Sequence, residues 1–321
     1  MNNRKKVLII GGLGFLGKNL YLRLKKNGYA VHILSDVLPD PADYFISLAD
    51  SNDIVRGDFR DTKLLSELIP RYFCILCFAG LSGAKSSLER PIIDSEVNCT
   101  THLQFLEICK KHNPDINIVF PSTRLVYGKP GYLPVDEKHP LNPESFYAVH
   151  KITAEYYYRI YYNIFNIKSV ILRISNPYGP FQKFGEIQYG ILNWFIYKAL
   201  KKEEIQLFGR GKQKRDYLFV DDLSALILRF LKTPELFDGS IYNVGYGKGI
   251  SLYEAIVTIK KYVPDLLYNT IPWPDTEMKI ETGDYYSDLG AIKQKTGWQP
   301  QLSFDEGIRR TVEFYQKTLH I

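Results

Sequence analysis

The feature that most constrains the fold of this chain is a glycine-rich segment, Gly11-Gly-Leu-Gly-Phe-Leu-Gly17, between the apolar run Val7–Ile10 and a helical stretch from Lys18. Glycines at this spacing permit a tight turn, a close approach of the backbone to a pyrophosphate, and close packing of a helix on a strand. The start of the helix adds N–H donors and partial positive charge. The segment therefore predicts a dinucleotide site, formed by Gly11, Gly14, Phe15, Leu16 and Gly17.

Short apolar runs recur along the first half of the chain, and longer stretches with helical periodicity separate most of them. The runs are rich in β-branched residues and comprise Val7–Ile10, Ala30–Leu34, Phe73–Phe78, Ile116–Phe120 and Ser169–Ile174. This alternation predicts an α/β fold with a Rossmann-type, doubly wound parallel sheet. We expect residues 1–177 to form the dinucleotide-binding domain and to carry the catalytic residues.

The alternation of strand and helix patterns becomes less regular beyond about Pro177. Aromatic and basic segments there surround a strand-like Tyr217–Val220 and a helix-like Asp222–Leu231. We expect residues 178–321 to form a smaller α/β region that mainly binds substrate, with some segments returning to the first domain. In doubly wound folds, ligands bind beyond the carboxyl ends of the strands. The loops that follow the apolar runs are therefore the predicted location of the chemistry.

Composition excludes several classes of protein. The 321 residues are 45% hydrophobic and 24% charged, and the net charge of +6 is spread out, without the dense basic stripe of a nucleic-acid-binding protein. No apolar run is long enough to span a bilayer, and the basic start Arg4-Lys-Lys6 lacks the cleavage site of a signal peptide. Cys74 and Cys77 lie on a predicted strand facing opposite sides, so they cannot readily hold a metal. We expect a cytoplasmic protein with no metal, nucleic-acid or membrane partner.

A ribose-binding residue is expected at the end of the second strand, about 20 residues after the glycine loop. That position holds Ser35-Asp36. Asp36 would accept hydrogen bonds from the ribose hydroxyls and favour NAD, whereas Ser35 would repel a 2′-phosphate less strongly. Asp36 fits a turn residue before Pro39 equally well. We expect NAD, and the sequence leaves NADP open.

Tyr147 and Lys151 place a phenol and an ammonium four residues apart. Asn142-Pro143 is the predicted N-cap and first residue of their helix, so both side chains lie on one helix face. A neighbouring cation favours the phenolate of a tyrosine, whose reference pKa is about 10. Tyr147 would then take a proton from a substrate hydroxyl while a hydride leaves the same carbon.

Two hydroxyls, those of Ser122 and Thr123, follow the core run Ile116–Phe120 and emerge at the carboxyl edge of the sheet. A hydroxyl there can hydrogen-bond the reacting oxygen and stabilise developing charge. We prefer Thr123 as the catalytic hydroxyl. The alternative is that both hydroxyls only cap the end of the strand.

With these motifs the chain resembles the extended short-chain dehydrogenase/reductases, and within them the nucleotide-sugar epimerases typified by UDP-glucose 4-epimerase. The resemblance extends over nearly the whole length. Its further segments are Gly57–Asp61, Cys77–Gly80, an RxxNxYGP motif at Leu172–Pro180, Gly209–Asp222, Tyr242–Gly245 and Gly297–Pro300.

The resemblance implies roles for individual residues. Asp58, next to Phe59, would reach the adenine of the cofactor, and Asn176 and Arg215 would hold the diphosphate of the substrate. The remaining cofactor residues that it implies are Phe59, Phe78, Ala79, Gly80, Asn98, Ser122, Tyr147 and Lys151. The remaining substrate residues are Ser82, Thr123 and Tyr147.

The chain also departs from the pattern of these relatives. Ile10 stands where a threonine usually opens the glycine loop. Near the C-terminal end, relatives place a second phosphate-binding arginine before an aspartate, but this chain reads Lys279-Ile-Glu-Thr-Gly-Asp284. Either Lys279 takes over that role or the nucleotide is held differently.

The residues after Thr123 separate the possible reactions. The resemblance implies that 4,6-dehydratases would have Asp-Glu there, and decarboxylating members a carboxylate, whereas this chain has Arg124 and Leu125. Neither can act as a carboxylate acid or base, so both activities are disfavoured. We expect an NAD-dependent 4-epimerase of a UDP-hexose, acting by transient oxidation at C4 and return of the hydride. The alternatives are an NAD(P)H-dependent reductase of a 4-keto-6-deoxy nucleotide-sugar and a non-catalytic dinucleotide-binding protein.

Relatives of this kind pair two helices from each subunit in a four-helix bundle. The matching segments are about Cys99–Lys111 and about Ser145–Ile164, and the second has more apolar surface than one helix face can bury internally. The resemblance therefore implies a homodimer.

Overall fold

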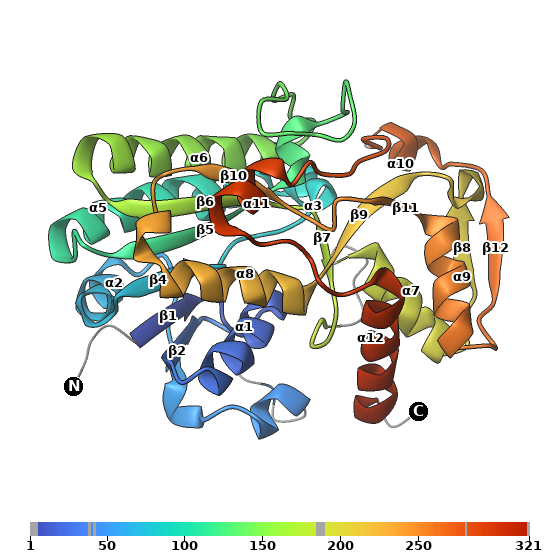
Figure 1. The fold of residues 1–321 in the computed structure, drawn as a ribbon, viewed down its shortest axis with the longest axis horizontal. Coiled ribbons are helices and arrows are strands. Elements are labelled where there is room, and N and C mark those ends of the chain that lie inside the picture. The colour runs from blue at the N-terminus through green and yellow to red at the C-terminus, as the bar shows by residue number, and fades with distance from the viewer. Residues whose placement is uncertain (1–5, 38–39, 41–42, 184–189, 280, 320–321) are drawn as a thin grey trace. The chain divides into compact units, whose positions relative to one another are not determined.

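The central sheet of the protein is parallel and doubly wound. The structure, a computed structural model, describes residues 6–37, 40, 43–183, 190–279 and 281–319. Within these residues, seven strands form one sheet in the order β10-β6-β5-β4-β1-β2-β3 (Figure 1). Their bounds are β1 Lys6–Ile10, β2 Ala30–Ser35, β3 Ile54–Arg56, β4 Cys74–Cys77, β5 Asn117–Thr123, β6 Lys168–Ile174 and β10 Ile241–Val244.

The direction and order of the strands confirm the predicted Rossmann-type fold. β1 pairs in parallel with β2 and β4, β2 with β3, and β4 with β5. Six of the strands follow the order 3-2-1-4-5-6 of dinucleotide-binding sheets. Strand β1 is central, and Val7–Ile10 has almost no solvent exposure, as expected for a strand covered on both faces.

Helices cover both faces of this sheet. Figure 1 shows α5 and α6 on one side of it and α1 and α8 on the other. α1 begins at Phe15, earlier than the predicted Lys18, because Gly14 is its N-cap. The bounds are α1 Phe15–Lys26, α2 Thr62–Leu68, α3 Ala84–Glu89, α4 Pro91–Ser95, α5 Thr101–His112, α6 Phe146–Phe165 and α8 Val220–Lys232.

The chain divides into two compact units, each assembled from several stretches. The first contains residues up to Val126, Ser145–Arg173 and Ser224–Tyr242. The second contains Tyr127–Glu144, Ile174–Leu223 and the residues from Asn243 onward. The assignment of residues 178–321 to substrate binding stays a prediction.

The second unit contains two small sheets and its own helical core. Its sheets have the orders β11-β9-β7 and β12-β8, and a hydrophobic core joins residues of α7, α9 and α12. The strands are β7 Asn176–Tyr178, β8 Ile205–Phe208, β9 Lys214–Phe219, β11 Gly249–Ser251 and β12 Tyr268–Ile271. The helices are α7 Ile191–Leu200, α9 Leu252–Tyr262, α10 Asp275–Lys279, α11 Gly290–Thr296 and α12 Phe304–Thr318.

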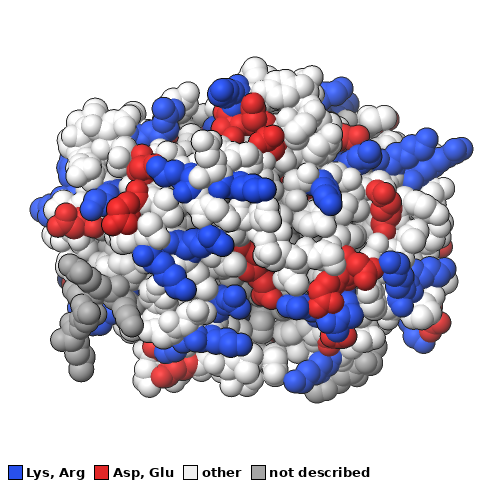
Figure 2. Space-filling model, viewed as in Figure 1, with Lys and Arg blue, Asp and Glu red and all other residues white. Residues whose placement is uncertain are grey.

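The charges on one face of the molecule are mixed in sign, and Cys74 and Cys77 are buried. On the face of the described residues shown in Figure 2, basic side chains lie among acidic ones and form no continuous stripe. Cys74 and Cys77 are free and buried at the two ends of β4. Across the described ranges, no helix is long and apolar enough to cross a membrane, and no cluster of His, Cys, Asp and Glu could hold a metal ion.

Candidate active site

The glycine loop packs directly on the loop that follows β4. At Gly11, where φ is +78°, a Cβ would lie 2.6 Å from the backbone nitrogen of Ala79. At Gly17, a Cβ would lie 2.5 Å from the Cα of Gly12. Both positions therefore exclude any larger residue. The structure thus brings two predicted cofactor segments together: the glycine loop and Phe78–Gly80.

The start of α1 offers open hydrogen-bond donors. Gly14 is the N-cap and its backbone N–H donates to the Gly11 carbonyl over 3.0 Å. No side chain caps this helix, and its first turn has no acidic residue. The first-turn N–H groups of a helix lack intrahelical acceptors and carry partial positive charge. Phe15 and Leu16, both half-buried, lie in this turn, which suits an anionic pyrophosphate.

The two candidates for the ribose position differ in exposure. Ser35 is buried at the end of β2, and its Oγ accepts a hydrogen bond from the Val37 backbone N–H over 3.2 Å. Asp36 is exposed just beyond the strand. The exposed carboxylate is therefore the better placed of the two to accept from ribose hydroxyls.

Asp58 and Phe59 have different surroundings. The Asp58 carboxylate accepts from Nε and Nη2 of Arg60 over 3.0 and 2.6 Å, and these bonds hold the pKa of Asp58 below its usual range. The Phe59 ring is buried against His102 and Phe105, with centroids 5.3 and 5.5 Å apart. Only the backbone of Phe59 could therefore reach a cofactor.

Asn98 anchors the loop that follows β4. It lies in a π-helical turn, Glu96–Thr100, and its Nδ2 donates to the Leu81 carbonyl over 3.0 Å. Its Oδ1 is buried without a hydrogen-bond partner, and a Cβ on Gly80 would lie 2.6 Å from it. Such π-turns are frequent at functional sites, and an unsatisfied buried acceptor suits a ligand with a donor. Ser82, in the same loop, is exposed.

The helix that carries Tyr147 and Lys151 starts later than predicted. The prediction of Asn142-Pro143 as N-cap and first residue is wrong: α6 begins at Phe146, and its N-cap is Ser145, whose Oγ accepts from the Ala148 N–H over 3.2 Å. Serine caps a helix as well as asparagine does, and Ser145 is the residue whose side chain makes the capping bond. The spacing of Tyr147 and Lys151 along the helix is unaffected.

Thr123 and Tyr147 meet at the end of β5. The hydroxyl of Thr123 accepts from the Leu125 N–H over 3.2 Å and lies beside the phenol of Tyr147, whose pKa it lowers. Burial and the negative charge of Asp94 act in the other direction, and the pKa of Tyr147 is raised overall. Burial therefore decides the direction of the Tyr147 pKa in the protein without ligands, and the expectation that Lys151 favours the phenolate stays a prediction.

Lys151 lies one helical turn after Tyr147 and is 4% exposed. Its Nζ lies 4.4 Å from the centroid of the Phe120 ring. Burial lowers the pKa of Lys151 to about 8, although the charges of Cys77, Glu155 and Asp94 oppose this change. Burial beside the Phe120 ring therefore makes the Lys151 ammonium easier to deprotonate than a lysine in water.

Ser122 is engaged in a buried network that sequence reasoning did not identify. Its Oγ donates to Oε1 of Glu155, which lies one turn beyond Lys151 on α6. Nη2 of Arg173 donates to Oε2 of Glu155 over 2.6 Å, and the side chains of this ion pair are 2% and 4% exposed. The Ser122 hydroxyl therefore has a structural partner, and a cofactor contact through it stays a prediction.

A second buried carboxylate, Asp94, also lay outside the sequence analysis. Its Oδ1 lies 2.6 Å from Nδ1 of His150, and its Oδ2 accepts from Nδ2 of Asn98 over 3.1 Å. The charge of Asp94 raises the pKa of both Tyr147 and Lys151. The sequence held one sign of this contact: His150, the partner of Asp94, lies between Tyr147 and Lys151 in the chain.

The two predicted diphosphate residues lie in the second unit. Asn176 begins β7 and is paired in register with Tyr217 on β9, the strand that also carries Arg215. Oδ1 of Asn176 is buried without a hydrogen-bond partner. Arg215, in contrast, is bound by Glu281, with Nη2 2.6 Å from Oε1. Lys279, which we considered as a replacement for the second phosphate-binding arginine, is exposed at the end of α10.

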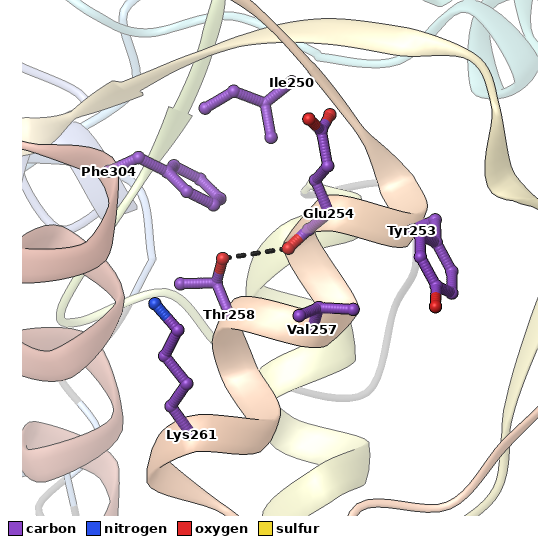
Figure 3. A pocket seen from close by; sticks show the side chains of 7 residues that line it. All are labelled: Ile250, Tyr253, Glu254, Val257, Thr258, Lys261 and Phe304. Atoms are coloured by element: carbon purple, nitrogen blue, oxygen red, sulfur yellow. Dashed lines mark hydrogen bonds between the residues drawn. The ribbon is translucent and has the colours of Figure 1, made fainter.

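A cleft elsewhere in the second unit contains none of the predicted site residues. Figure 3 shows it over the outer face of α9, with Phe304 at the start of α12 on its far side. The only hydrogen bond drawn there joins the Thr258 hydroxyl to the Glu254 carbonyl within the helix. This surface has no arrangement of groups that suggests catalysis.

Comparison with known proteins finds relatives over nearly the whole chain. The model of the NAD dependent epimerase/dehydratase family matches residues 7–245. UDP-glucose 4-epimerase of Mycolicibacterium smegmatis is 30% identical, covering 97% of this chain and 98% of the relative. CDP-paratose 2-epimerase of Salmonella typhi is 27% identical, covering 96% and 98%. The solved UDP-glucose 4-epimerase of Thermus thermophilus in complex with NAD is 28% identical, with a TM-score of 0.82 over 97% of this chain and 99% of that one.

Proposed function

The chain belongs to the NAD-dependent epimerase/dehydratase family, and from this premise we propose that it is an NAD-dependent nucleotide-sugar 4-epimerase of the UDP-glucose/UDP-galactose type. The observation that carries the proposal is the position of the Thr123 hydroxyl beside the phenol of Tyr147, with Lys151 one turn further along α6. Epimerisation at C4 needs a hydroxyl, a proton acceptor, a cation and a nicotinamide, and it needs no further acid.

The carboxylates near this set are engaged with other side chains. Glu155 accepts from Arg173 and Ser122, and Asp94 is bound by His150. The two positions after Thr123 are occupied by Arg124 and Leu125. A dehydratase needs a carboxylate acid beside the catalytic hydroxyl, so this arrangement supports epimerisation over dehydration.

NAD suits the groups that surround the glycine loop. Gly11 provides room for it, because a Cβ is absent there. The open N-terminus of α1 and the unpartnered Oδ1 of Asn98 provide polar partners. The exposed carboxylate of Asp36 favours a ribose with a free 2′-hydroxyl. When bound, NAD would accept a hydride from C4 of the sugar and return it.

The residues of the chain would move the proton. Tyr147 would take the proton of the C4 hydroxyl as the C–H bond breaks, with Thr123 donating a hydrogen bond to the reacting oxygen. Because burial raises the pKa of Tyr147, the phenolate needs the charge of Lys151 and of the oxidised nicotinamide. After the 4-keto sugar turns, Tyr147 would return the proton to the oxygen of the opposite epimer.

The cofactor carried by the purified protein tests the proposal. We expect denaturation to release NAD in near-equal amount to the protein, since an epimerase that lost its cofactor in mid-reaction would strand the keto sugar. A 4-keto-6-deoxy sugar reductase has to exchange cofactor at each turnover. Protein that releases no dinucleotide and oxidises NADPH stoichiometrically with a 4-keto-6-deoxy nucleotide-sugar would make the reductase the correct assignment.

We expect the protein to be a homodimer. Along α6, an apolar stripe of Val149, Tyr156, Ile160 and Ile164 is between 43% and 68% exposed. Monomers seldom leave such stripes uncovered. Light scattering at micromolar concentration should give twice the chain mass, and introducing Glu at Ile160 and Ile164 should halve it. Val257→Glu, at a similarly exposed position on α9, is the control and should change nothing; a monomeric wild type would contradict the prediction.

A further inference from the structure

The predicted phosphate-binding arginine is already occupied by an anion of the chain itself. Nη2 of Arg215 donates to both carboxylate oxygens of Glu281, over 2.6 and 2.7 Å. Nη1 donates to the carbonyls of Lys214 and Gly283, over 2.9 and 2.8 Å. These contacts engage both terminal nitrogens, which are among the groups through which an arginine binds a phosphate.

The pair is part of a built structure and is not a loose surface contact. The side chains of Arg215 and Glu281 are only 11% and 18% exposed. Oε1 of Glu281 also accepts from the Gly283 N–H over 2.8 Å. The same segment is fastened to β9, because the Lys214 N–H donates to Oδ1 of Asp284 over 2.8 Å. Glu281 is therefore held in the position from which it binds the guanidinium.

A diphosphate and the Glu281 carboxylate compete for the same donors. Two anions on one guanidinium repel each other, and each gains most from a pair of parallel N–H donors. A ligand with two negative charges gains more from the cation than one carboxylate does. It can displace Glu281, whereas a ligand with a single weak anion cannot.

We propose that Glu281 is an internal competitor that occupies Arg215 until a nucleoside diphosphate displaces it, and that it thereby weakens and selects substrate binding. The inference rests on the proposed function, because it takes the substrate to contain a diphosphate. This role is the opposite of that of a positioning residue. A positioning residue would hold Arg215 in place for the ligand, and its removal would weaken ligand binding.

The sign of the effect of Glu281→Gln on the affinity for UDP tests the inference. Gln has the same size and keeps one acceptor oxygen, which can still accept from the Gly283 N–H, but it loses the charge and the second acceptor. We expect calorimetric titration to show a Kd for UDP that is lower by about threefold or more, as removal of a modest ion pair allows. Log Kd should also depend more steeply on log salt. The gain in UDP affinity should vanish when Arg215→Ala is introduced into both the wild type and Glu281→Gln, because the guanidinium for which Glu281 and UDP compete is then absent.

Two further variants keep the result interpretable. Glu281→Asp shortens the side chain and keeps the charge, so it should give a smaller gain in UDP affinity. It also provides a test if Glu281→Gln folds poorly. Glu306→Gln removes another glutamate that binds an arginine, with Nη2 of Arg309 2.7 Å from Oε1, and should leave the affinity for UDP unchanged.

Weaker or unchanged UDP binding in both Glu281 variants would overturn the inference, as would a wild-type protein and variants that bind no UDP. Turnover is measured separately. Tighter UDP binding in Glu281→Gln without epimerisation of any UDP-sugar would sink the proposed function and leave this inference standing. Epimerisation combined with weakened UDP binding in Glu281→Gln would do the reverse.

Discussion

Tyr147→Phe is expected to lose nearly all turnover, on the order of 10³-fold in kcat, because general acid–base catalysis contributes on that scale. Only the phenolic oxygen is removed. The ring stays in place at the start of α6, and the glycine loop and the Asn98 turn are untouched. The melting temperature and the amount of bound dinucleotide should therefore match those of the wild type.

Tyr156→Phe is the matched control for this variant. Tyr156 lies on the same helix, in the apolar stripe that we expect to meet the partner subunit; its ring is kept and its hydroxyl takes no part in the reaction, so the change should not alter kcat. Normal turnover in Tyr147→Phe would remove this tyrosine from the mechanism. Loss of turnover together with loss of bound dinucleotide would point to a structural role instead.

Glu155→Ala is expected to produce the largest loss of stability. The carboxylate is buried between Arg173 and Ser122, so its removal leaves a guanidinium without its counter-charge. Breaking a buried ion pair by removing one partner costs about 3–5 kcal/mol. Thermal unfolding should begin on the order of 10 °C lower, given that about 1 kcal/mol shifts Tm by 2–4 °C in domains of this size.

The double variant Glu155→Leu with Arg173→Met separates charge from packing. Because it removes both charges, it should recover most of the stability that Glu155→Ala loses. Asp265→Ala breaks an exposed pair with Lys202, in which the two side chains are 75% and 73% exposed, and should cost less than about 1 kcal/mol. A Glu155→Ala protein that unfolds at the wild-type temperature would show that the buried pair contributes nothing to stability.

Strong local patterns made much of the first unit predictable. Val7–Ile10 reads as a buried strand because it is a continuous apolar run, and the glycines that follow are required by close backbone contacts. β3 was missed because it has three residues, Ile54–Arg56, and β12 because its residues are largely exposed. The start of α6 was misplaced because Asn142 and Ser145 are both good N-caps.

The candidate site was predictable where it is written in local motifs. Tyr147 and Lys151 are one helical turn apart, so their spacing alone places them on one face. The partners that tune them were not predictable, since Glu155 and Arg173 meet across the core, as do Asp94 and His150. The direction of the Tyr147 pKa also depends on burial, which a motif does not contain.

The same reason applies to the substrate residues. A resemblance could assign Arg215 to phosphate binding, but the carboxylate bound to it comes from 66 residues further along the chain. Only the folded structure shows that this arginine already has an anionic partner. The sequence showed that the Lys279–Asp284 segment differs from the pattern of its relatives. It did not show that Glu281 in this segment binds Arg215.

The most direct test of the central claim follows the hydrogen at C4. UDP-galactose with deuterium at C4 is incubated with the purified protein, without added cofactor, and the sugars are analysed by NMR. We predict UDP-glucose that keeps its deuterium at C4, because the same hydride is removed and returned within one active site. No UDP-glucose, or a product that requires added NAD(P)H, would contradict the assignment as a 4-epimerase.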